Sequence, residues 1–415
     1  MDKRVQRKSF KTWSLLSLSL VLMAFLSNPV FANQSSPVLL GIDRLFTPEF
    51  LSLIKGKRIA IVANGASLNR DEQSTVDLLI HYPHSEVVAL FSPEHGFNVK
   101  DDDKVSDGGS ANIPIYSLYG PRKSPTAEQL SGVDVIVFDL ETVGLRYFTY
   151  ITTLALVMQS AKSENIPIVV LDRVNPLGGN LVTGALLDNK YTGGFAGYYP
   201  IPTRYGLTMG ELARYYNRYF KIGANLKVVP LKNWRRESLF IDTDLTWHAP
   251  SPALPSFQQA YLYSIFGPYE SLQLAVGRSQ SNKEAFRRYG APWISAEEAQ
   301  NLVVQLNELQ LPGLVFEVVS WIPDRAKYEN QQCHGFAVKI AALREVNGLQ
   351  SFIKVTQVLN KQFGNKLSLS GMDGMIGSAE FRQSIQQEEP AKTIIDKLKV
   401  DNQAFIRQRE AILLY

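Results

Sequence analysis

Cysteine is almost absent from this chain of 415 residues. Cys333 is the only one, so no disulfide can form within the chain, and we expect a buried, unreactive thiol. Several familiar signatures are also missing, namely G-x-G-x-x-G, G-x-x-x-x-G-K-[ST], H-E-x-x-H and G-x-S-x-G. Nucleotide-binding proteins, zinc peptidases and serine hydrolases therefore have no motif support. The sequence has no visible internal repeat and no low-complexity tract.

The positive net charge is confined to the start of the chain. The formal net charge is +4, and residues 1–32 contain five Lys or Arg residues and one Asp. The rest therefore carries 38 of the 43 basic residues and 38 of the 39 acidic residues, which makes it formally neutral. A neutral chain lacks the basic surface that attracts nucleic acids and anionic membranes, so we expect no nucleic-acid partner.

The N-terminal segment has the pattern of a secretory signal peptide. A basic start precedes an apolar stretch, Trp13 to Leu26, which is shorter than the ~20 residues of a membrane-spanning helix. Val30-Phe31-Ala32 then offers a cleavage site before Asn33. We expect residues 1–32 to be removed, the mature protein to be periplasmic or secreted, and no stable membrane insertion after cleavage. An uncleaved N-terminal anchor is the alternative.

Short apolar runs alternate with amphipathic stretches between residues 41 and 220. The runs are Arg58–Ala63, Glu86–Phe91, Val133–Phe138 and Ile168–Leu171. Polar and apolar residues do not alternate strictly within them, which is typical of strands covered on both faces. Helical patterns lie between and after them, and one begins with a capping box, Thr208 with Glu211 three residues later. These repeated units predict an α/β fold with a doubly wound, mostly parallel sheet over residues 38–222.

The pattern changes after residue 222. A short apolar run, Leu226–Leu231, leads into an irregular stretch rich in Pro and aromatic residues from Trp247 to Pro268. The remaining pattern predicts a helix over 296–309, strands over 314–319 and 336–340, and helices over 351–363 and 391–414. We therefore predict a second, smaller α+β domain over residues 223–415.

Polar side chains follow each of the four strands predicted in the first domain. They are Asn64 after the first strand; Glu94 and His95 after the second; Asp139, Glu141, Arg146 and Tyr150 after the third; and Asp172, Arg173 and Asn175 after the fourth. The carboxyl ends of parallel strands share one edge of a sheet, where ligand crevices form. We therefore expect a binding site at this edge, against the alternative that loops are simply polar.

Glu94 is the leading candidate for a catalytic group. It lies between Pro93 and the His95-Gly96 pair, so its backbone is constrained and a ligand can approach closely. A carboxyl at this place can act as a general acid if burial raises its pKa; capping of a following helix is the alternative. His95 either orients Glu94, binds substrate or is structural.

The other candidates have less specific signals. Asp139 and Glu141 need not face the same side, because side chains alternate along a strand, so one of them can be catalytic and the other structural. Arg146 and Arg204 are candidate clamps for an anionic group, and Tyr150 could stack on a sugar ring. The run Asp101–Asp103 lacks the spacing of a calcium loop, and we predict neither a metal nor a cofactor.

These motifs resemble those of the NamZ/YbbC-type exo-β-N-acetylmuramidases, long labelled a bacterial domain of unknown function. The matching stretches include Ser92–Gly96, Pro114–Gly120, Gly144–Tyr150, Leu171–Pro176, Gly206–Leu212, Gly290–Trp293 and Leu413–Tyr415. The resemblance spans nearly the whole mature chain. It implies a Rossmann-like domain joined to a smaller C-terminal domain with the site in the cleft between them, and Glu94 as the catalytic residue.

Four positions depart from the pattern of this family. Gly65, Thr142, Tyr205 and Val276 stand where the family usually has Gln, Asp, His and Glu, whereas Glu270 matches. These departures leave a diverged member with altered sugar specificity, or one without activity, as an alternative.

The function that follows is that of an exported hydrolase that releases terminal N-acetylmuramic acid from the non-reducing ends of peptidoglycan fragments. Glycosidic cleavage needs an acid, for which we expect Glu94, and a second group, for which Asp139, Glu141 and Glu270 compete. Arg146, Arg204 or Arg278 could bind the lactyl carboxylate of the sugar. The main alternative is a non-catalytic exported protein that binds muropeptides or another sugar. An esterase or amidase lacks a nucleophile–base motif, and the oligomeric state stays open.

Overall fold

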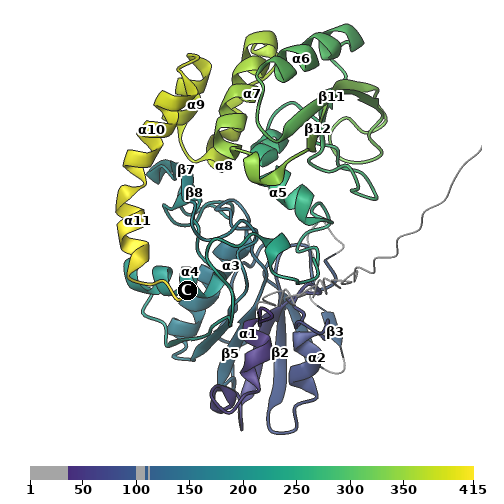
Figure 1. Cartoon of the computed structure of the whole chain (residues 1–415). Coiled ribbons are helices and arrows are strands. Elements are labelled where there is room, and N and C mark those ends of the chain that lie inside the picture. The colour runs from purple at the N-terminus through teal and green to yellow at the C-terminus, as the bar shows by residue number, and fades with distance from the viewer. Residues whose placement is uncertain (1–35, 100–107, 111–112) are drawn as a thin grey trace, which may run out of the picture. The chain divides into compact units, whose positions relative to one another are not determined.

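A seven-stranded sheet forms the first half of the protein, for which we use a computed structural model that describes residues 36–99, 108–110 and 113–415 (Figure 1). The predicted signal peptide, residues 1–32, and the run Asp101–Asp103 lie outside these residues. The strand order is β3-β4-β2-β1-β5-β6-β9. The strands are β1 (Arg58–Ala63), β2 (Glu86–Ser92), β3 (Gly108–Ser110), β4 (Ile113–Ser117), β5 (Val135–Asp139), β6 (Ile168–Leu171) and β9 (Leu226–Val229).

Every neighbouring pair of these strands is parallel except β3 with β4. From β1 the chain proceeds to β2 and β4 on one side, and then resumes with β5 on the other side of β1. The strand order therefore reverses between β1 and β5, and in open α/β sheets such a switch point opens a crevice at the carboxyl ends of the strands. The predicted doubly wound, mostly parallel sheet is confirmed.

The register of the sheet sets the ends of its central strands level with one another. Ala63 at the end of β1 pairs with Asp139 at the end of β5. Ser92 at the end of β2 pairs with Ser117 at the end of β4. The residues that follow these strands therefore meet at one edge, as the sequence predicts.

Helices cover the sheet, and α4 begins where the sequence signal predicts. They are α1 (Gly41–Leu45), α2 (Thr75–Ile80), α3 (Tyr150–Ser163) and α4 (Met209–Tyr219). The expected capping box opens α4: the Glu211 amide donates to Thr208 Oγ1 over 3.2 Å, and the Thr208 amide donates to Glu211 Oε2 over 3.0 Å. Strands β1 and β5 are buried along their length apart from Arg58, so the sheet is the centre of the core.

The second half of the chain contains a smaller antiparallel sheet of order β10-β12-β11. Its strands are β10 (Arg288–Ala291), β11 (Leu314–Trp321) and β12 (Cys333–Ile340), and its helices are α5 (Phe257–Phe266), α6 (Ala296–Glu308), α7 (Gly348–Phe363), α8 (Asp373–Ile376), α9 (Ala379–Gln386), α10 (Ala391–Asp401) and α11 (Gln403–Glu410). This confirms a second α+β domain. Cys333 is buried, and burial raises the pKa of its thiol to about 11, in agreement with an unreactive thiol.

Two expectations for the second half were wrong. The stretch from Trp247 to Pro268 is not irregular throughout, because α5 occupies its second part. Residues on all sides of α5 are buried, so no apolar stripe marks it as a helix in the sequence. The predicted single helix over 391–414 is divided at Asn402, whose side-chain amide donates to the Gly184 carbonyl over 2.9 Å.

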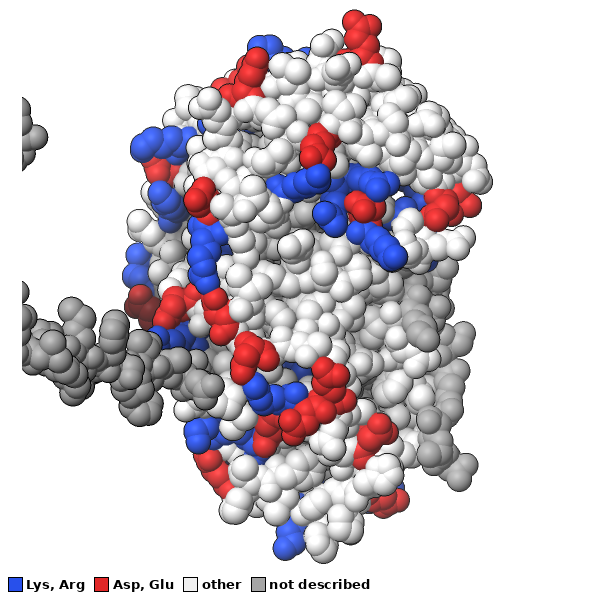
Figure 2. Space-filling view, turned by 45° about the vertical axis from the view of Figure 1, so that its right-hand side comes forward, with Lys and Arg blue, Asp and Glu red and all other residues white. Residues whose placement is uncertain are grey.

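Charged side chains of both signs are mixed on the surface. In Figure 2, Lys and Arg side chains gather in the upper part of the face, with Asp and Glu side chains among them. Within residues 36–99, 108–110 and 113–415, no helix is long and apolar enough to cross a membrane.

The C-terminal segment returns from the second half of the chain to the large sheet. Figure 1 shows α10 and α11 running down beside β7 (Thr183–Leu186) and β8 (Pro202–Arg204) to a C-terminus near α4. The Tyr415 hydroxyl donates to Asp172 Oδ2 and accepts from the Leu231 amide, both over 2.6 Å. The Leu414 amide donates to Glu211 Oε1 over 2.8 Å. These bonds, which we call the C-terminal clasp, hold the matching Leu413–Tyr415 motif against β6, β9 and α4.

We predict that Tyr415→Phe destabilises the fold by about 1–3 kcal/mol, because it leaves the Leu231 amide without a partner and removes one of the hydrogen bonds to the buried Asp172 carboxylate. Thermal denaturation of the purified chain measures the loss. Tyr82→Phe is the matched control, since the buried Tyr82 hydroxyl has no partner among the described residues. Equal melting temperatures for the two variants would contradict a role of the clasp.

Candidate functional site

Glu94 lies immediately beyond β2, at the carboxyl edge of the sheet, and it is partly exposed. The next two residues, His95 and Gly96, both have left-handed backbones, with φ of 70° and 69°. This conformation costs a histidine about 1–3 kcal/mol, and such strain is concentrated at functional sites. Because two left-handed residues follow it, the chain turns sharply after Glu94 and leaves its side chain on the rim of the site.

A threonine holds the Glu94 carboxyl group in place. Thr149 Oγ1, just before α3, donates to Glu94 Oε2 over 2.5 Å. Thr149 belongs to the Gly144–Tyr150 motif, but its role was missed because a threonine before a helix more often caps the helix.

Asn64 and Tyr150 form a buried support beneath Glu94. Asn64 Nδ2 donates to the Tyr150 hydroxyl over 3.0 Å, and the hydroxyl lies 2.6 Å from the Pro250 carbonyl and 3.1 Å from the Glu94 carbonyl. Burial raises the pKa of Tyr150, and the Glu94 carboxylate raises it further. Both predicted residues are therefore near Glu94, but Tyr150 is fully buried and cannot stack on a sugar ring.

A buried ion pair joins the ends of β5 and β6. Arg173 donates to both carboxylate oxygens of Asp139, over 2.5 Å from Nε and 2.8 Å from Nη2. Thr75 Oγ1 donates to Asp139 Oδ2 as well, over 2.5 Å. Asp139 is completely buried, so the carboxylate is enclosed by its own donors.

Glu141 is the member of this group that reaches the surface. Arg173 Nη1 donates to Glu141 Oε1 over 2.7 Å, and 18% of the Glu141 side chain is exposed. Burial raises the pKa of Glu141, although Arg173 opposes this change. Burial would lower the pKa of Arg173, but the two carboxylates outweigh it and raise the pKa. Arg173 is thus a permanent cation that orients Glu141.

Glu270 and Arg278 from the second half of the chain line a common cavity of about 330 Å³, together with Val276, Arg325 and Lys327. The charges of this cavity and of Glu94 all act on the buried Tyr263. Burial raises the pKa of Tyr263, and the carboxylates of Glu270 and Glu94 raise it further while Arg278 lowers it.

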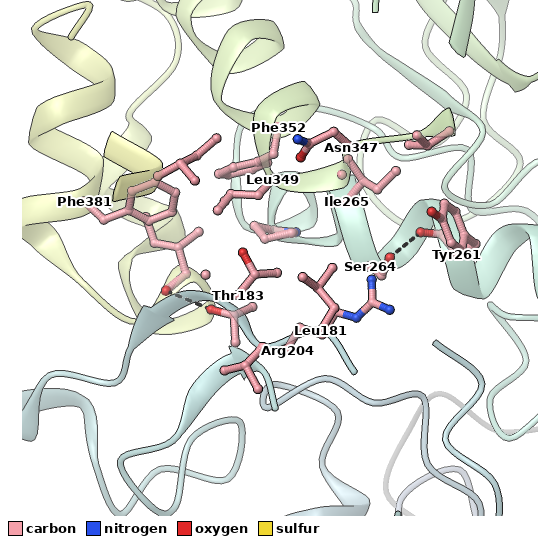
Figure 3. Close-up of a pocket in the computed structure, with 18 of the residues that line it drawn as sticks. Leu181, Thr183, Arg204, Tyr261, Ser264, Ile265, Asn347, Leu349, Phe352 and Phe381 are labelled. Carbon is pink, nitrogen blue, oxygen red and sulfur yellow. Dashed lines mark hydrogen bonds between the residues drawn. The ribbon is translucent and has the colours of Figure 1, made fainter. Parts of the chain in front are cut away.

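Arg146 and Arg204 are directed away from Glu94 into other surroundings. Arg146 is buried and donates to the Met375 carbonyl over 2.9 Å and to Thr203 Oγ1 over 3.3 Å. It is so closely packed that a Cβ added at Gly377 would lie 2.4 Å from Arg146 Nη2. Arg204 donates to the Leu177 carbonyl and lines a different cavity (Figure 3). Neither arginine lines the cavity that contains Glu270 and Arg278.

Asp172 and Asn175 have structural partners. Asp172 is buried in the C-terminal clasp, where burial raises its pKa to about 7 despite hydrogen bonds from Tyr415, Gly210 and Thr208 that lower it. Asn175 donates to the Leu207 carbonyl over 2.9 Å and accepts from the Leu177 amide over 3.0 Å. Both side chains fix loops and have no accessible surface for a ligand.

His248 is a candidate that the sequence pattern did not reveal. It is partly buried, and burial lowers its pKa, as does the nearby Arg173 cation, while Glu72 raises it. Two residues later the Pro250 carbonyl accepts the Tyr150 hydrogen bond, which ties this segment to Glu94. The irregular stretch around Trp247 gave no signal for the position of His248.

Two of the four departures from the family pattern contact each other. Thr142 Oγ1 lies 2.6 Å from the Tyr205 hydroxyl, and both residues are buried. Val276 lines the cavity of Glu270 and Arg278, and the Gly65 amide donates to the Phe97 carbonyl just after Glu94 over 2.6 Å. The Thr142–Tyr205 pair is therefore a joint change within the core, whereas Gly65 and Val276 are at the rim of the site.

Comparison with known proteins supports the likeness that the motifs indicate. Residues 59–258 match the family model for the N-terminal part of exo-β-N-acetylmuramidase NamZ, and residues 261–415 match the model for its C-terminal part. The peptidoglycan β-N-acetylmuramidase NamZ of Bacillus subtilis (strain 168) is 35% identical over 401 residues, which cover 94% of this chain and 95% of that protein.

Two crystal structures of DUF1343 family proteins from Bacteroides fragilis NCTC 9343 have the same fold. The first is 30% identical with a TM-score of 0.81, and the alignment covers 91% of this chain and 99% of the other. The second is 27% identical with a TM-score of 0.74, covering 92% and 99%. Since both family models match in order and together cover most of the sequence, this chain belongs to the family of the exo-β-N-acetylmuramidase NamZ.

Proposed function

We propose that this protein is an exported glycosidase that releases N-acetylmuramic acid from the non-reducing ends of peptidoglycan fragments during cell-wall turnover. Membership of the NamZ family and the name of the Bacillus subtilis relative support the reaction and the substrate. The signal-peptide pattern of residues 1–32 supports export.

The observation that carries the proposal is the position of Glu94. Its carboxyl group is on the rim beside the switch point of the sheet, one oxygen is held by Thr149, and the strained turn that follows keeps it there. A group so held can protonate the oxygen of the scissile glycosidic bond as the bond breaks. We therefore assign Glu94 the role of general acid.

Glu141 is our choice for the second carboxylate. Asp139 is enclosed by Arg173 and Thr75, which leaves it no surface toward a sugar. Glu141 follows a strand that ends at the same edge of the sheet as the strand before Glu94; it is partly exposed, and Arg173 holds it in one orientation. In this place it would orient the attacking group, either a water or the acetamido oxygen of the substrate.

Arg278 is the arginine best placed to bind the lactyl carboxylate. Arg146 and Arg204 have partners in other parts of the structure, whereas Arg278 lines a cavity with Glu270. A guanidinium can bind a carboxylate through two parallel hydrogen bonds. Arg278 would then distinguish N-acetylmuramic acid from N-acetylglucosamine, which has no lactyl group.

Non-catalytic binding of sugars is the competing function. Departures near the site favour it, but two of the four form the internal Thr142–Tyr205 contact and leave the rim unchanged. Incubation of the purified chain with a chromogenic N-acetylmuramide separates the two functions. Turnover supports the enzyme, and tight binding without turnover supports the binding protein.

We predict that Glu94→Gln lowers kcat by about 10²–10⁴-fold on a disaccharide substrate, because the leaving sugar needs a proton. The loss should be much smaller on a 4-nitrophenyl muramide, whose leaving group is stable as an anion. Glu86→Gln is the matched control, since Glu86 lies at the opposite, exposed end of the same strand. Equal losses on both substrates would argue against an acid role.

We predict that Glu141→Gln mainly lowers activity, whereas Asp139→Asn mainly lowers stability. Glu141→Gln should lower kcat with little change in melting temperature. Asp139→Asn should destabilise the fold by about 3–5 kcal/mol, because it leaves Arg173 buried and incompletely paired.

Glu141 must be ionised to act, and its pKa is raised. Wild-type activity should therefore fall as the pH drops through a value above about 4.3, and this fall at low pH should be absent in Glu141→Gln. A strong loss of stability in Glu141→Gln would contradict this division of roles.

We predict that Arg278→Met raises KM for an N-acetylmuramide by about tenfold or more, because the lost bond involves two charges. The variant should leave the weaker turnover of the matching N-acetylglucosaminide unchanged, since that sugar has no carboxylate. A parallel loss on both sugars would mean that Arg278 does not recognise the lactyl group.

A further inference from the structure

A second cavity, of about 470 Å³, lies between the β7–β8 pair and the helices of the second half of the chain (Figure 3). Its walls are mainly apolar and come from distant segments: Leu181, Ile265, Leu349, Phe352, Phe381 and Ile395. Its volume is in the range of small-molecule sites, which is about 300–1,000 Å³. No residue that we assign to the muramidase reaction lines it.

The walls of this cavity suit an apolar ligand better than a sugar. A saccharide would place many hydroxyl groups against the Leu, Ile and Phe side chains, and each buried hydroxyl without a partner costs free energy. Polar residues such as Thr183, Ser264 and Asn347 also line the cavity, but apolar atoms form most of its wall surface. The walls therefore favour an occupant with an apolar body and a small polar part.

Arg204 supplies the place for that polar group. It extends from β8, donates through Nη2 to the Leu177 carbonyl, and has a buried Nε without a partner among the described residues. Burial lowers the pKa of this arginine to about 10, and the described residues include no acidic side chain in an ion pair with it. A partly buried guanidinium that lacks a counter-ion favours an anionic ligand.

The other charges at the cavity agree with an anion. Gly348 and Leu349, at the N-terminus of the 16-residue helix α7, line the cavity, and the positive end of a helix dipole attracts negative charge. Glu345 is the one acidic residue in the lining and is exposed. Arg344 and Lys399 also line the cavity and are paired with Asp242 and Asp396.

We propose that this cavity binds an amphipathic carboxylate, a medium-chain fatty acid or a molecule like it, with the carboxylate on Arg204 and the chain between α5, α7 and α9. Tyr147 connects the cavity with the sugar site: it lines the cavity, and its hydroxyl donates to the Tyr263 carbonyl over 2.8 Å. The two sites are otherwise separate, and binding at one does not require the other.

Calorimetric titration of the purified chain with octanoate, below the concentration at which it forms micelles, tests this site. Octanamide is the neutral probe of the same shape. Octanoate should bind at least about tenfold more tightly than octanamide, because only octanoate is charged. Arg204→Met should remove this preference, while Arg278→Met in the sugar site should retain it.

A second variant tests the cavity without changing the arginine. Leu349→Trp fills the space and should weaken the binding of octanoate and octanamide alike, at an unchanged melting temperature. No preference for octanoate in the wild type would overturn the proposal, as would unchanged binding in Leu349→Trp. Competition between octanoate and an N-acetylmuramide would also overturn it, since the cavity would then be part of the sugar site.

Discussion

The buried pair of Asp139 and Arg173 is the interaction on which the site depends. It joins the ends of β5 and β6 at the edge where the sheet opens, and it leaves one arm of the guanidinium for Glu141. An ion pair removed from water is of little net benefit to stability, because both charges lose their hydration. Its value here is geometric, since it fixes a third, accessible carboxylate in one orientation.

Glu94, like Glu141, is an accessible carboxyl group held in place by buried residues. Its carboxyl group is held by Thr149, and its backbone lies over the Asn64–Tyr150 pair. The two carboxylates are thus carried on separate, rigid supports from neighbouring parts of one sheet edge. Catalytic geometry must be maintained within fractions of an ångström, and buried hydrogen bonds provide that constraint better than mobile loops do.

Much of this arrangement could be predicted from the sequence. Apolar runs and a capping box were sufficient for the parallel sheet and for the edge where Asn64, Glu94 and Glu141 meet. The pattern could not distinguish polar side chains that face a ligand from those that face the protein, because Asp172, Asn175 and Arg146 look the same in one dimension. Some of their partners, such as Tyr415 for Asp172 and the Met375 carbonyl for Arg146, are more than 200 residues away along the chain. Helix α5 was missed for a related reason, since a helix buried on all sides has no periodic stripe.

The return of α10 and α11 to the large sheet has a consequence for motion. The polypeptide crosses between the two halves of the structure twice, once in the segment before α5 and once in the helices that end at the C-terminal clasp. A single linker permits rotation of one half against the other in any direction, whereas two separate crossings restrict the rotation to one axis. Any movement of one half against the other would then be a hinge movement about the line that joins the two crossings.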